Sequence, residues 1–267
     1  MDTDALIDCV ARRLEGEPGV RALCLSGSHG AGLADAYSDL DFLAILSDPH
    51  MSAARGDAFS DLWRAALEPA GGIVLWRVRS GPTILINAIT TGWLRIDVLA
   101  TTADPLHTRR GLKVLFDRDG IAADLPETPE PGIDRDRLAW QIEEFIRILG
   151  LLPVAMGRAE YLNAVTGVFH LRNLLIDLMI AETGAPHRGG ALHLNRLITD
   201  DQKALLTALP APVPTRESAI ATHLAYAGAY LPLARPLADR LGIDWPEPFE
   251  RATWSHLERE LAIDRPS

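Results

Sequence analysis

The sequence is nearly without cysteine and has no long apolar run. Its two cysteines, Cys9 and Cys24, fall on a predicted helix and a predicted buried strand. Small buried side chains are a better interpretation of both than a disulfide, which indicates the cytoplasm. No run of 18 or more apolar residues indicates a membrane span. The first residues lack the basic region and apolar core of a secretory signal. We therefore expect a cytoplasmic chain with no membrane partner.

Lysine is also scarce, because nearly all the basic residues are arginine and only Lys113 and Lys203 differ. The net charge is −10 and no basic stripe is visible. Both features argue against a protein that grips a long phosphate backbone, which needs clustered Lys and Arg. An acidic surface is compatible with a polycationic small substrate, and it equally keeps an ordinary protein soluble. We therefore expect no extended nucleic-acid partner.

The stretch from residue 23 to 46, LCLSGSHGAGLADAYSDLDFLAIL, predicts a strand, a glycine-rich turn that opens a short helix, and a second strand. Asp39 and Asp41 stand at the start of the second strand. Because successive side chains of a strand alternate between its faces, both aim the same way, whereas Leu40 and Phe42 aim the other way. Two carboxylates this close repel each other unless a cation lies between them, and their hard oxygen atoms suit Mg²⁺.

The turn before these aspartates has the properties of a phosphate cradle. Gly27 allows backbone to come close to a ligand, and Ser28 offers a hydroxyl group. The predicted helix spans residues 27–34, and amides at the start of a helix attract phosphate. A phosphate cradle and a metal clamp joined by ten residues predict a nucleotide site.

Gly27-Ser28, a ten-residue spacer and Asp39-Leu40-Asp41 together resemble the signature of the nucleotidyltransferase superfamily. That superfamily includes the DNA polymerase β-like enzymes and the small antibiotic nucleotidyltransferases for kanamycin, streptomycin and lincosamides. The resemblance is specific over roughly residues 20–100 and only architectural after that. It implies a third carboxylate on a later strand, facing the first two.

Asp97, in the run WLRIDVLA, is the natural third carboxylate. Alternation puts Leu94, Ile96 and Val98 on one face of this predicted strand and Asp97 on the other. An acid in an apolar strand is uncommon, because an unpaired buried charge costs several kcal/mol. The order of the motifs along predicted strands therefore favours one site built from all three aspartates.

The resemblance implies how these residues act. Asp39 and Asp41 would hold two Mg²⁺ ions, and Asp97 would complete the metal that binds the acceptor hydroxyl. ATP or another NTP would be the co-substrate. The predicted reaction transfers a nucleoside monophosphate, AMP from ATP, to a hydroxyl of a small molecule such as an aminoglycoside or lincosamide antibiotic, and releases pyrophosphate.

Two other functions stay open at this point. One is a nucleotidyltransferase that modifies a protein or a tRNA, as in toxin–antitoxin systems. The other is a non-catalytic nucleotide-binding module on the same fold, against which the retention of all three acids speaks. The acceptor, the nucleotide and the oligomeric state, a dimer included, also stay open.

Several side chains qualify as the base for the acceptor hydroxyl. In the kanamycin-type enzymes a glutamate early in the helical domain serves as this base. The corresponding stretch here is IEEFIRILG, in which Arg147 takes the place of the glutamate. Glu144, one turn earlier, and Glu160 are the substitutes, while Asp97 would serve if it lay beside the acceptor. These alternatives are equally open in the sequence.

The phosphate cradle departs from the family pattern, because residues 29–38 include no Lys or Arg. Many relatives carry a basic residue just after the glycine-serine pair. The triphosphate then needs arginines from elsewhere, and Arg147, Arg158 and Arg172 on predicted helices are the candidates.

The patterns along the chain predict two domains. Residues 1–123 read as an α/β (α+β) nucleotidyltransferase domain, a mixed sheet of about five strands with helices on one face. Residues 124–136 carry three prolines and predict a linker. Residues 137–267 predict an all-α helical domain, in which Pro232 and Pro236 would kink or divide one long helix. The helices are expected at 135–152, 158–180, 201–209, 215–241 and 249–263.

Overall fold

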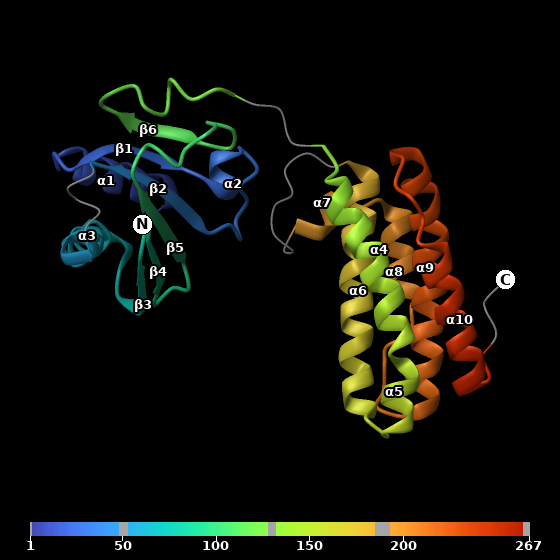
Figure 1. The fold of residues 1–267 in the computed structure, drawn as a ribbon. Coiled ribbons are helices and arrows are strands. Elements are labelled where there is room, and N and C mark those ends of the chain that lie inside the picture. The colour runs from blue at the N-terminus through green and yellow to red at the C-terminus, as the bar shows by residue number, and fades with distance from the viewer. Residues whose placement is uncertain (1, 48–52, 128–131, 185–192, 264–267) are drawn as a thin grey trace. The chain divides into compact units, whose positions relative to one another are not determined.

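The computed structural model describes residues 2–47, 53–127, 132–184 and 193–263 (Figure 1). The chain forms two compact units, Met1–Pro129 and Glu130–Ser267. The division falls inside the segment 124–136 that the sequence predicts as a linker, of which residues 128–131 lie outside the described residues. An α/β unit followed by an all-α unit is the predicted fold class, and it is confirmed.

A six-stranded mixed sheet forms the centre of the first unit, in the strand order β3-β4-β5-β2-β1-β6. The sheet therefore has six strands, where the sequence predicts about five. Strands β2 and β5 are parallel, and every other neighbouring pair is antiparallel. The elements of this unit are α1 (Thr3–Glu15), β1 (Val20–Leu25), α2 (Gly27–Gly30), β2 (Leu40–Leu46), α3 (Ala53–Ala66), η2 (Glu68–Ala70), β3 (Ile73–Ser80), β4 (Ile84–Thr90), β5 (Arg95–Thr101) and β6 (Lys113–Asp117).

Helices α1 and α3 cover one face of the sheet with an apolar core. Phe42 of β2 packs edge-on against Trp63 of α3, with 5.1 Å between the ring centroids. Ile96 and Val98 of β5 lie in the same core and are fully buried. The predicted alternation is therefore confirmed in both strands, because Asp39, Asp41 and Asp97 fall on positions that belong to the other face.

Helix α2 is shorter than the sequence predicts. It ends at Gly30, whereas the prediction extends to residue 34. Gly32 has φ +71°, in the left-handed region, which a right-handed helix cannot include. A helix of four residues has little dipole, so the attraction of phosphate to a helix start contributes less here than the sequence suggests.

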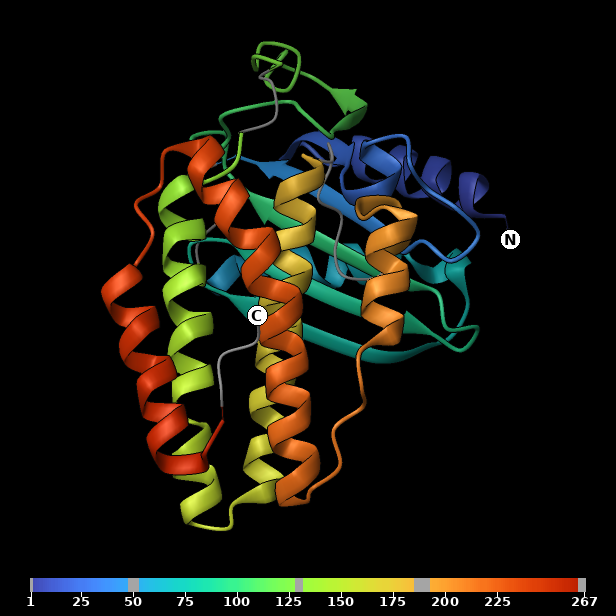
Figure 2. The same ribbon diagram turned by 90° about the vertical axis from the view of Figure 1, so that its right-hand side faces the viewer.

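The second unit is a bundle in which α4 and α10 run in one direction and α6 and α9 in the other (Figures 1 and 2). Two predicted helices differ from the structure. The first ends at Gly150, and the second begins at Tyr161, because Ala159 has φ 55° and separates α5 from α6. The elements are α4 (Arg135–Gly150), α5 (Leu152–Gly157), α6 (Tyr161–Thr183), α7 (Leu194–Leu197), α8 (Asp200–Ala208), α9 (Arg216–Leu241) and α10 (Glu247–Leu261).

Helix α9 stays one helix despite its two prolines. Pro232 and Pro236 both lie inside the span Arg216–Leu241, so of the two predicted outcomes, a kink or a division, the division is wrong. Each proline removes one N–H donor from the helix. Packing of α9 against its neighbours offsets that loss, since Tyr230, Ala234 and Leu237 are almost completely buried beside the prolines.

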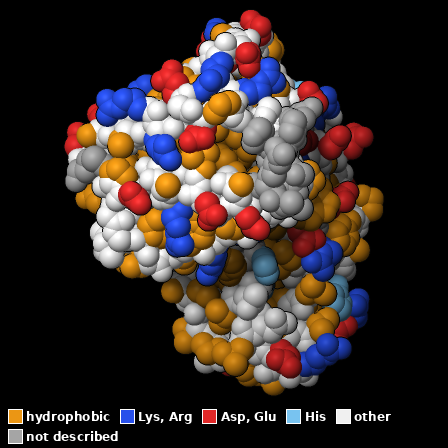
Figure 3. Space-filling view, turned by 90° about the vertical axis from the view of Figure 1, so that its left-hand side faces the viewer, with side chains coloured by type: hydrophobic (Ala, Val, Ile, Leu, Met, Phe, Trp, Pro, Cys, Tyr) orange, Lys and Arg blue, Asp and Glu red, His pale blue; other side chains and the backbone are white. Residues whose placement is uncertain are grey.

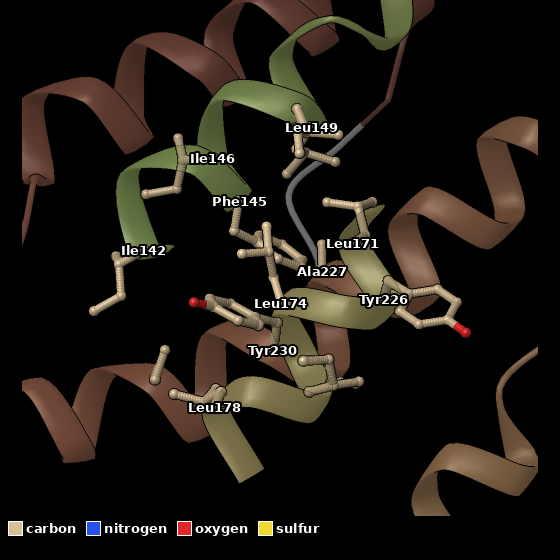
Figure 4. Close-up of a cluster of buried hydrophobic side chains, with 14 of the residues drawn as sticks. Ile142, Phe145, Ile146, Leu149, Leu171, Leu174, Leu178, Tyr226, Ala227 and Tyr230 are labelled. Atoms are coloured by element: carbon tan, nitrogen blue, oxygen red, sulfur yellow. The ribbon is translucent and has the colours of Figure 1, made fainter. Parts of the chain in front are cut away.

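The core of the bundle lies between α4, α6 and α9. Phe145 of α4 stacks on Tyr230 of α9 with ring centroids 3.8 Å apart. Within the described residues, α6 is the one helix whose length and apolar character would suffice to cross a membrane. Its buried side chains, such as Leu171, Leu175 and Leu178, pack in the bundle, whereas Leu162 and Phe169 are exposed. The labelled side chains of this core are Ile142, Phe145, Ile146, Leu149, Leu171, Leu174, Leu178, Tyr226, Ala227 and Tyr230 (Figure 4).

Charged side chains of both signs are interspersed on the face shown in Figure 3.

Candidate active site

A row of polar residues crosses four neighbouring strands on the face opposite α1 and α3. Asp41 of β2 pairs with Asp97 of β5, Asp97 pairs with Asn87 of β4, and Asn87 pairs with Arg77 of β3. Residues directly opposite each other on neighbouring strands share a face. The register therefore sets Asp97 beside Asp41. Asp39 precedes Asp41 by two positions and so lies on the same side.

The aspartates of this row are crowded and half-buried. Burial, followed by the charges of Asp39 and Asp97, raises the pKa of Asp41 to about 6. Burial also raises the pKa of Asp97 above its ordinary value, against a hydrogen bond from Asn87 that lowers it. Arg95 lowers both pKa values but does not cancel the burial. A cation that replaced the protons would relieve this crowding.

Gly27 allows a close approach to Asp41, whereas its predicted approach to a ligand stays a prediction. Its φ is +55°, and a Cβ built on it would overlap the carboxylate of Asp41. The backbone N–H of Ser26 donates to the carbonyl oxygen of Asp41 at 2.8 Å, which ties the turn to β2. The glycine is thus required so that the turn and the acidic strand can lie side by side.

The hydroxyl of Ser28 is a buried polar atom without a partner. Among the described residues, its Oγ is one of four buried side-chain oxygen or nitrogen atoms that make no hydrogen bond. Such an atom costs about 1–3 kcal/mol. A phosphate oxygen bound at the turn would satisfy it, so the observation fits the role predicted for Gly27 and Ser28.

The chemistry of the donor set also fits a divalent cation, although the side chains are not closed around one. Within the part of the chain that the structure describes, no three His, Cys, Asp or Glu side chains are grouped to hold one metal ion. Asp39 instead forms an ion pair with Arg95, with 3.4 Å between Oδ2 and Nη2. Metal binding by Asp39, Asp41 and Asp97 therefore stays a prediction, and it requires that Arg95 release Asp39.

A pocket of about 320 Å³ lies over β3, β4 and β5 beside the acids. Asp39 and Asp97 line it together with residues that the sequence analysis does not single out. Two of these residues, Arg77 and Arg79, lie on β3. The alternation within IVLWRVRS and the short β3–β4 connection could have predicted them, because both features place these side chains on the acid-bearing face. The additional polar residues are Arg77, Arg79, Asn87 and Arg95.

The residues proposed as bases and phosphate-binding cations outside the sheet all belong to the helical unit. Glu144 and Arg147 form a two-point ion pair, with oxygen–nitrogen distances of 2.6 and 2.7 Å. The hydrogen bond from Arg147 lowers the pKa of Glu144, which makes this carboxylate a weaker base. Four of the five line one pocket of about 310 Å³, namely Glu144, Arg147, Arg158 and Glu160.

Arg172 lies apart from that group. It donates to the hydroxyl of Tyr226 at 3.5 Å, across α6 and α9. That hydrogen bond is long. Packing of Arg172 between the two helices is enough to explain why this arginine is half-buried. The roles of Arg147, Arg158 and Arg172 toward phosphate stay predictions.

Comparison with known proteins gives likenesses of structure alone. A scan against protein-family models gives no match, and a search of curated proteins gives none. An aminoglycoside 6-adenyltransferase from Bacillus subtilis is 13% identical with a TM-score of 0.43, over 96% of this chain and 97% of that one. A nucleotidyltransferase-like protein from Exiguobacterium sibiricum 255-15 is 14% identical with a TM-score of 0.40, over 96% and 88%.

A third solved structure, the Cid1 poly(U) polymerase with bound MgGTP, covers 39% of this chain and 31% of its own. Its identity is 21% and its TM-score 0.28. Because all three TM-scores lie below 0.5, function has to follow from the side chains of this chain.

Proposed function

We propose that the chain is a Mg²⁺-dependent nucleotidyltransferase, which moves a nucleoside monophosphate, AMP from ATP, to a hydroxyl of a small molecule. Pyrophosphate is the second product. The observation that supports this most is the register between β2 and β5, with Asp41 opposite Asp97. The same Asp41 fills the space that Gly27 leaves free. Three acids on one face next to a glycine-serine turn are what nucleotidyl transfer requires.

In this proposal the acids form the centre of the reaction. Asp39, Asp41 and Asp97 would hold divalent metal, which supplies charge neutralisation at the transferred phosphate. Asn87 donates a hydrogen bond to Asp97 and thereby fixes the orientation of that carboxylate. Arg95, once it leaves Asp39, provides a guanidinium beside the reacting groups.

The turn binds the triphosphate. Ser28 donates its hydroxyl, which makes no hydrogen bond within the described residues, to a phosphate oxygen. Gly27 contributes indirectly, because its missing side chain leaves room for the carboxylate of Asp41 beside the turn. A phosphate group at this point lies directly beside Asp41, as the metal chemistry requires.

Asp97 is the best placed of the three bases that the sequence leaves open. Its carboxylate lies beside Asp41 at the proposed metal site, where the acceptor hydroxyl would bind. Glu144 has a lowered pKa because Arg147 binds it. Glu160 is exposed at the start of α6.

The test uses ATP radiolabelled at the α-phosphate, Mg²⁺ and a panel of hydroxyl acceptors. The panel contains aminoglycosides and lincosamides, which the family resemblance implies, and also tRNA and a protein mixture. We expect label on a small molecule and a loss of about 100-fold or more in Asp41→Asn, because charge neutralisation carries this chemistry. Asp61→Asn, an exposed change on α3, is the control. Label on tRNA or protein alone, or an unchanged rate in Asp41→Asn, contradicts the proposal.

A further inference from the structure

Two arginines of the edge strand β3 lie on the same face as the aspartates. Arg77 stands opposite Asn87, which in turn stands opposite Asp97. Arg79 is two residues further along β3 and so shares that face. Both arginines line the pocket that Asp39 and Asp97 also line.

Neither arginine is held by the fold. In the described part of the chain, the side chains of Arg77 and Arg79 make no hydrogen bond and no ion pair, and both residues are exposed. Charged residues also protect an edge strand from pairing with another chain. That role does not require the arginines to face the acids, whereas a binding role does.

The order of groups across the sheet gives the arginines a place in the reaction. The turn with Gly27 and Ser28 lies at β1 and β2, the acids follow on β2 and β5, and the arginines come last on β3. From Asp97 to Arg77 is two strand spacings, about 10 Å. In an in-line displacement the attacking oxygen enters opposite the leaving group. With the triphosphate at the turn, the acceptor lies over β4 and β3.

We infer that the acceptor carries an anionic group, a phosphate or a carboxylate, which Arg77 and Arg79 bind. This inference rests on the proposed function, in which the acceptor is the small molecule whose hydroxyl receives AMP. A guanidinium offers a planar fork that matches both anions at two points. The same pair repels a polycation, so an aminoglycoside is a poor fit to this side of the site.

The first experiment measures anion binding and needs no catalysis. Inorganic phosphate is titrated calorimetrically into the full chain with saturating Mg²⁺ and a non-hydrolysable ATP analogue, which occupies the turn. We expect phosphate to bind the wild type and to bind Arg77→Gln/Arg79→Gln about tenfold or more weakly, since two charge-assisted contacts are lost. Arg77→Lys/Arg79→Lys keeps both charges and is expected to bind more tightly than the double glutamine variant.

Arg12→Gln is the matched control, because Arg12 is exposed on α1, which packs on the other face of the sheet. We expect this change to leave phosphate binding unaltered. Equal binding by the wild type and Arg77→Gln/Arg79→Gln overturns the inference, and so does a wild type that binds no phosphate.

The second experiment compares acceptors that differ in charge alone. Glycerol, glycerate and glycerol 3-phosphate all offer hydroxyl groups. We expect kcat/KM for AMP transfer to rise about tenfold or more from glycerol to its two anionic relatives. In Arg77→Gln/Arg79→Gln the KM for the anionic acceptor rises and the KM for ATP stays unchanged.

The outcomes separate this inference from the proposed function. In one outcome, the variant transfers AMP as fast as the wild type does, and glycerol or kanamycin receives AMP as fast as the anionic acceptors do. That result overturns the inference of an anionic acceptor and does not affect the proposed nucleotidyltransferase function. An absence of AMP transfer to every acceptor overturns the proposed function. The phosphate titration then still decides whether Arg77 and Arg79 form an anion site.

Discussion

The guanidinium of Arg95 lies 3.4 Å from the carboxylate of Asp39, on the strand beside it. This ion pair engages one of the three acids, whose charge also raises the pKa of Asp41 and of Asp97. Both side chains are about one third exposed, so solvent weakens the pair to about 0.2–1 kcal/mol. A divalent cation therefore has little to overcome when it takes Asp39 from Arg95.

Replacing Arg95 should strengthen metal binding. In Arg95→Gln, Asp39 is free in the absence of metal, and the apparent Kd for Mg²⁺ is expected to fall by up to about fivefold, the factor equivalent to an exposed ion pair. Calorimetric titration with Mg²⁺ measures the change, with Arg12→Gln as the control. Weaker Mg²⁺ binding in Arg95→Gln would show that Arg95 supports the metal ligands and does not compete for them.

Gly27 and Gly32 allow the clash with Asp41 to be separated from backbone strain. Both have a positive φ, but a Cβ at Gly32 meets nothing within 4 Å. Each alanine variant should lose about 1–3 kcal/mol of unfolding free energy through strain. We expect Gly27→Ala also to reduce turnover by about 100-fold, because the Asp41 carboxylate has to move. Urea unfolding and the transfer assay test this, and equal turnover in both variants would refute it.

The unpartnered hydroxyl of Ser28 predicts a change that harms binding without harming the fold. Ser28→Ala removes a buried unsatisfied oxygen, so the unfolding free energy should stay the same or rise by about 1 kcal/mol. The KM for ATP should rise about tenfold or more, as expected for a lost hydrogen bond to a charged group.

Thr101→Val is the matched control for Ser28→Ala. Thr101 also has a buried, unpartnered Oγ, and it is 2% exposed at the end of β5. Its replacement should stabilise the fold by a similar amount and leave the KM for ATP unaltered. A Ser28→Ala enzyme with normal KM and reduced stability would assign Ser28 a purely structural role.

His223 makes the helical unit sensitive to acid. Its Nδ1 lies 2.7 Å from the carbonyl oxygen of Ala219, so Nδ1 carries the proton and donates it. Burial lowers the pKa of His223 below its ordinary value. Below the unfolded pKa of about 6.5 the unfolded state therefore binds the extra proton first. Stability is fully present above that pH and falls as the pH drops through it.

The measurement is urea unfolding between pH 7.5 and 5.5. We expect His223→Gln to lose less unfolding free energy across this range than the wild type does. His170→Gln is the control, because His170 and His223 both line the 310 Å³ pocket of the helical unit, but His170 is exposed. A variant at position 223 with the wild-type slope would place the acid sensitivity elsewhere.

The sequence predicts the first half of the site because that half depends on local patterns. Alternation within β2 and within β5 fixes which side chains face away from the core, and this determines the side of Asp39, Asp41 and Asp97. The parallel pairing of β2 with β5 sets Asp41 beside Asp97. That pairing is a long-range choice, which the family resemblance implies and the local pattern alone does not contain.

The remaining features depend on three-dimensional geometry that no short stretch of the sequence determines. Helix α2 stops early because of the backbone at Gly32, and glycine is compatible with either outcome. Arg77 joins the row only through the registers of β3 with β4 and of β4 with β5. The pairing of Arg95 with Asp39 likewise needs two residues 56 positions apart in the sequence to lie side by side.

Metal binding by the three aspartates is the claim on which the rest depends, and Mn²⁺ titration tests it most directly. The electron paramagnetic resonance signal of free Mn²⁺ falls as the ion binds, so it reports binding without any assumption about the acceptor. We predict that wild-type protein without nucleotide binds Mn²⁺, that Asp61→Asn binds it equally, and that Asp39→Asn, Asp41→Asn and Asp97→Asn each bind it about tenfold or more weakly. Undiminished Mn²⁺ binding in Asp97→Asn would contradict the account.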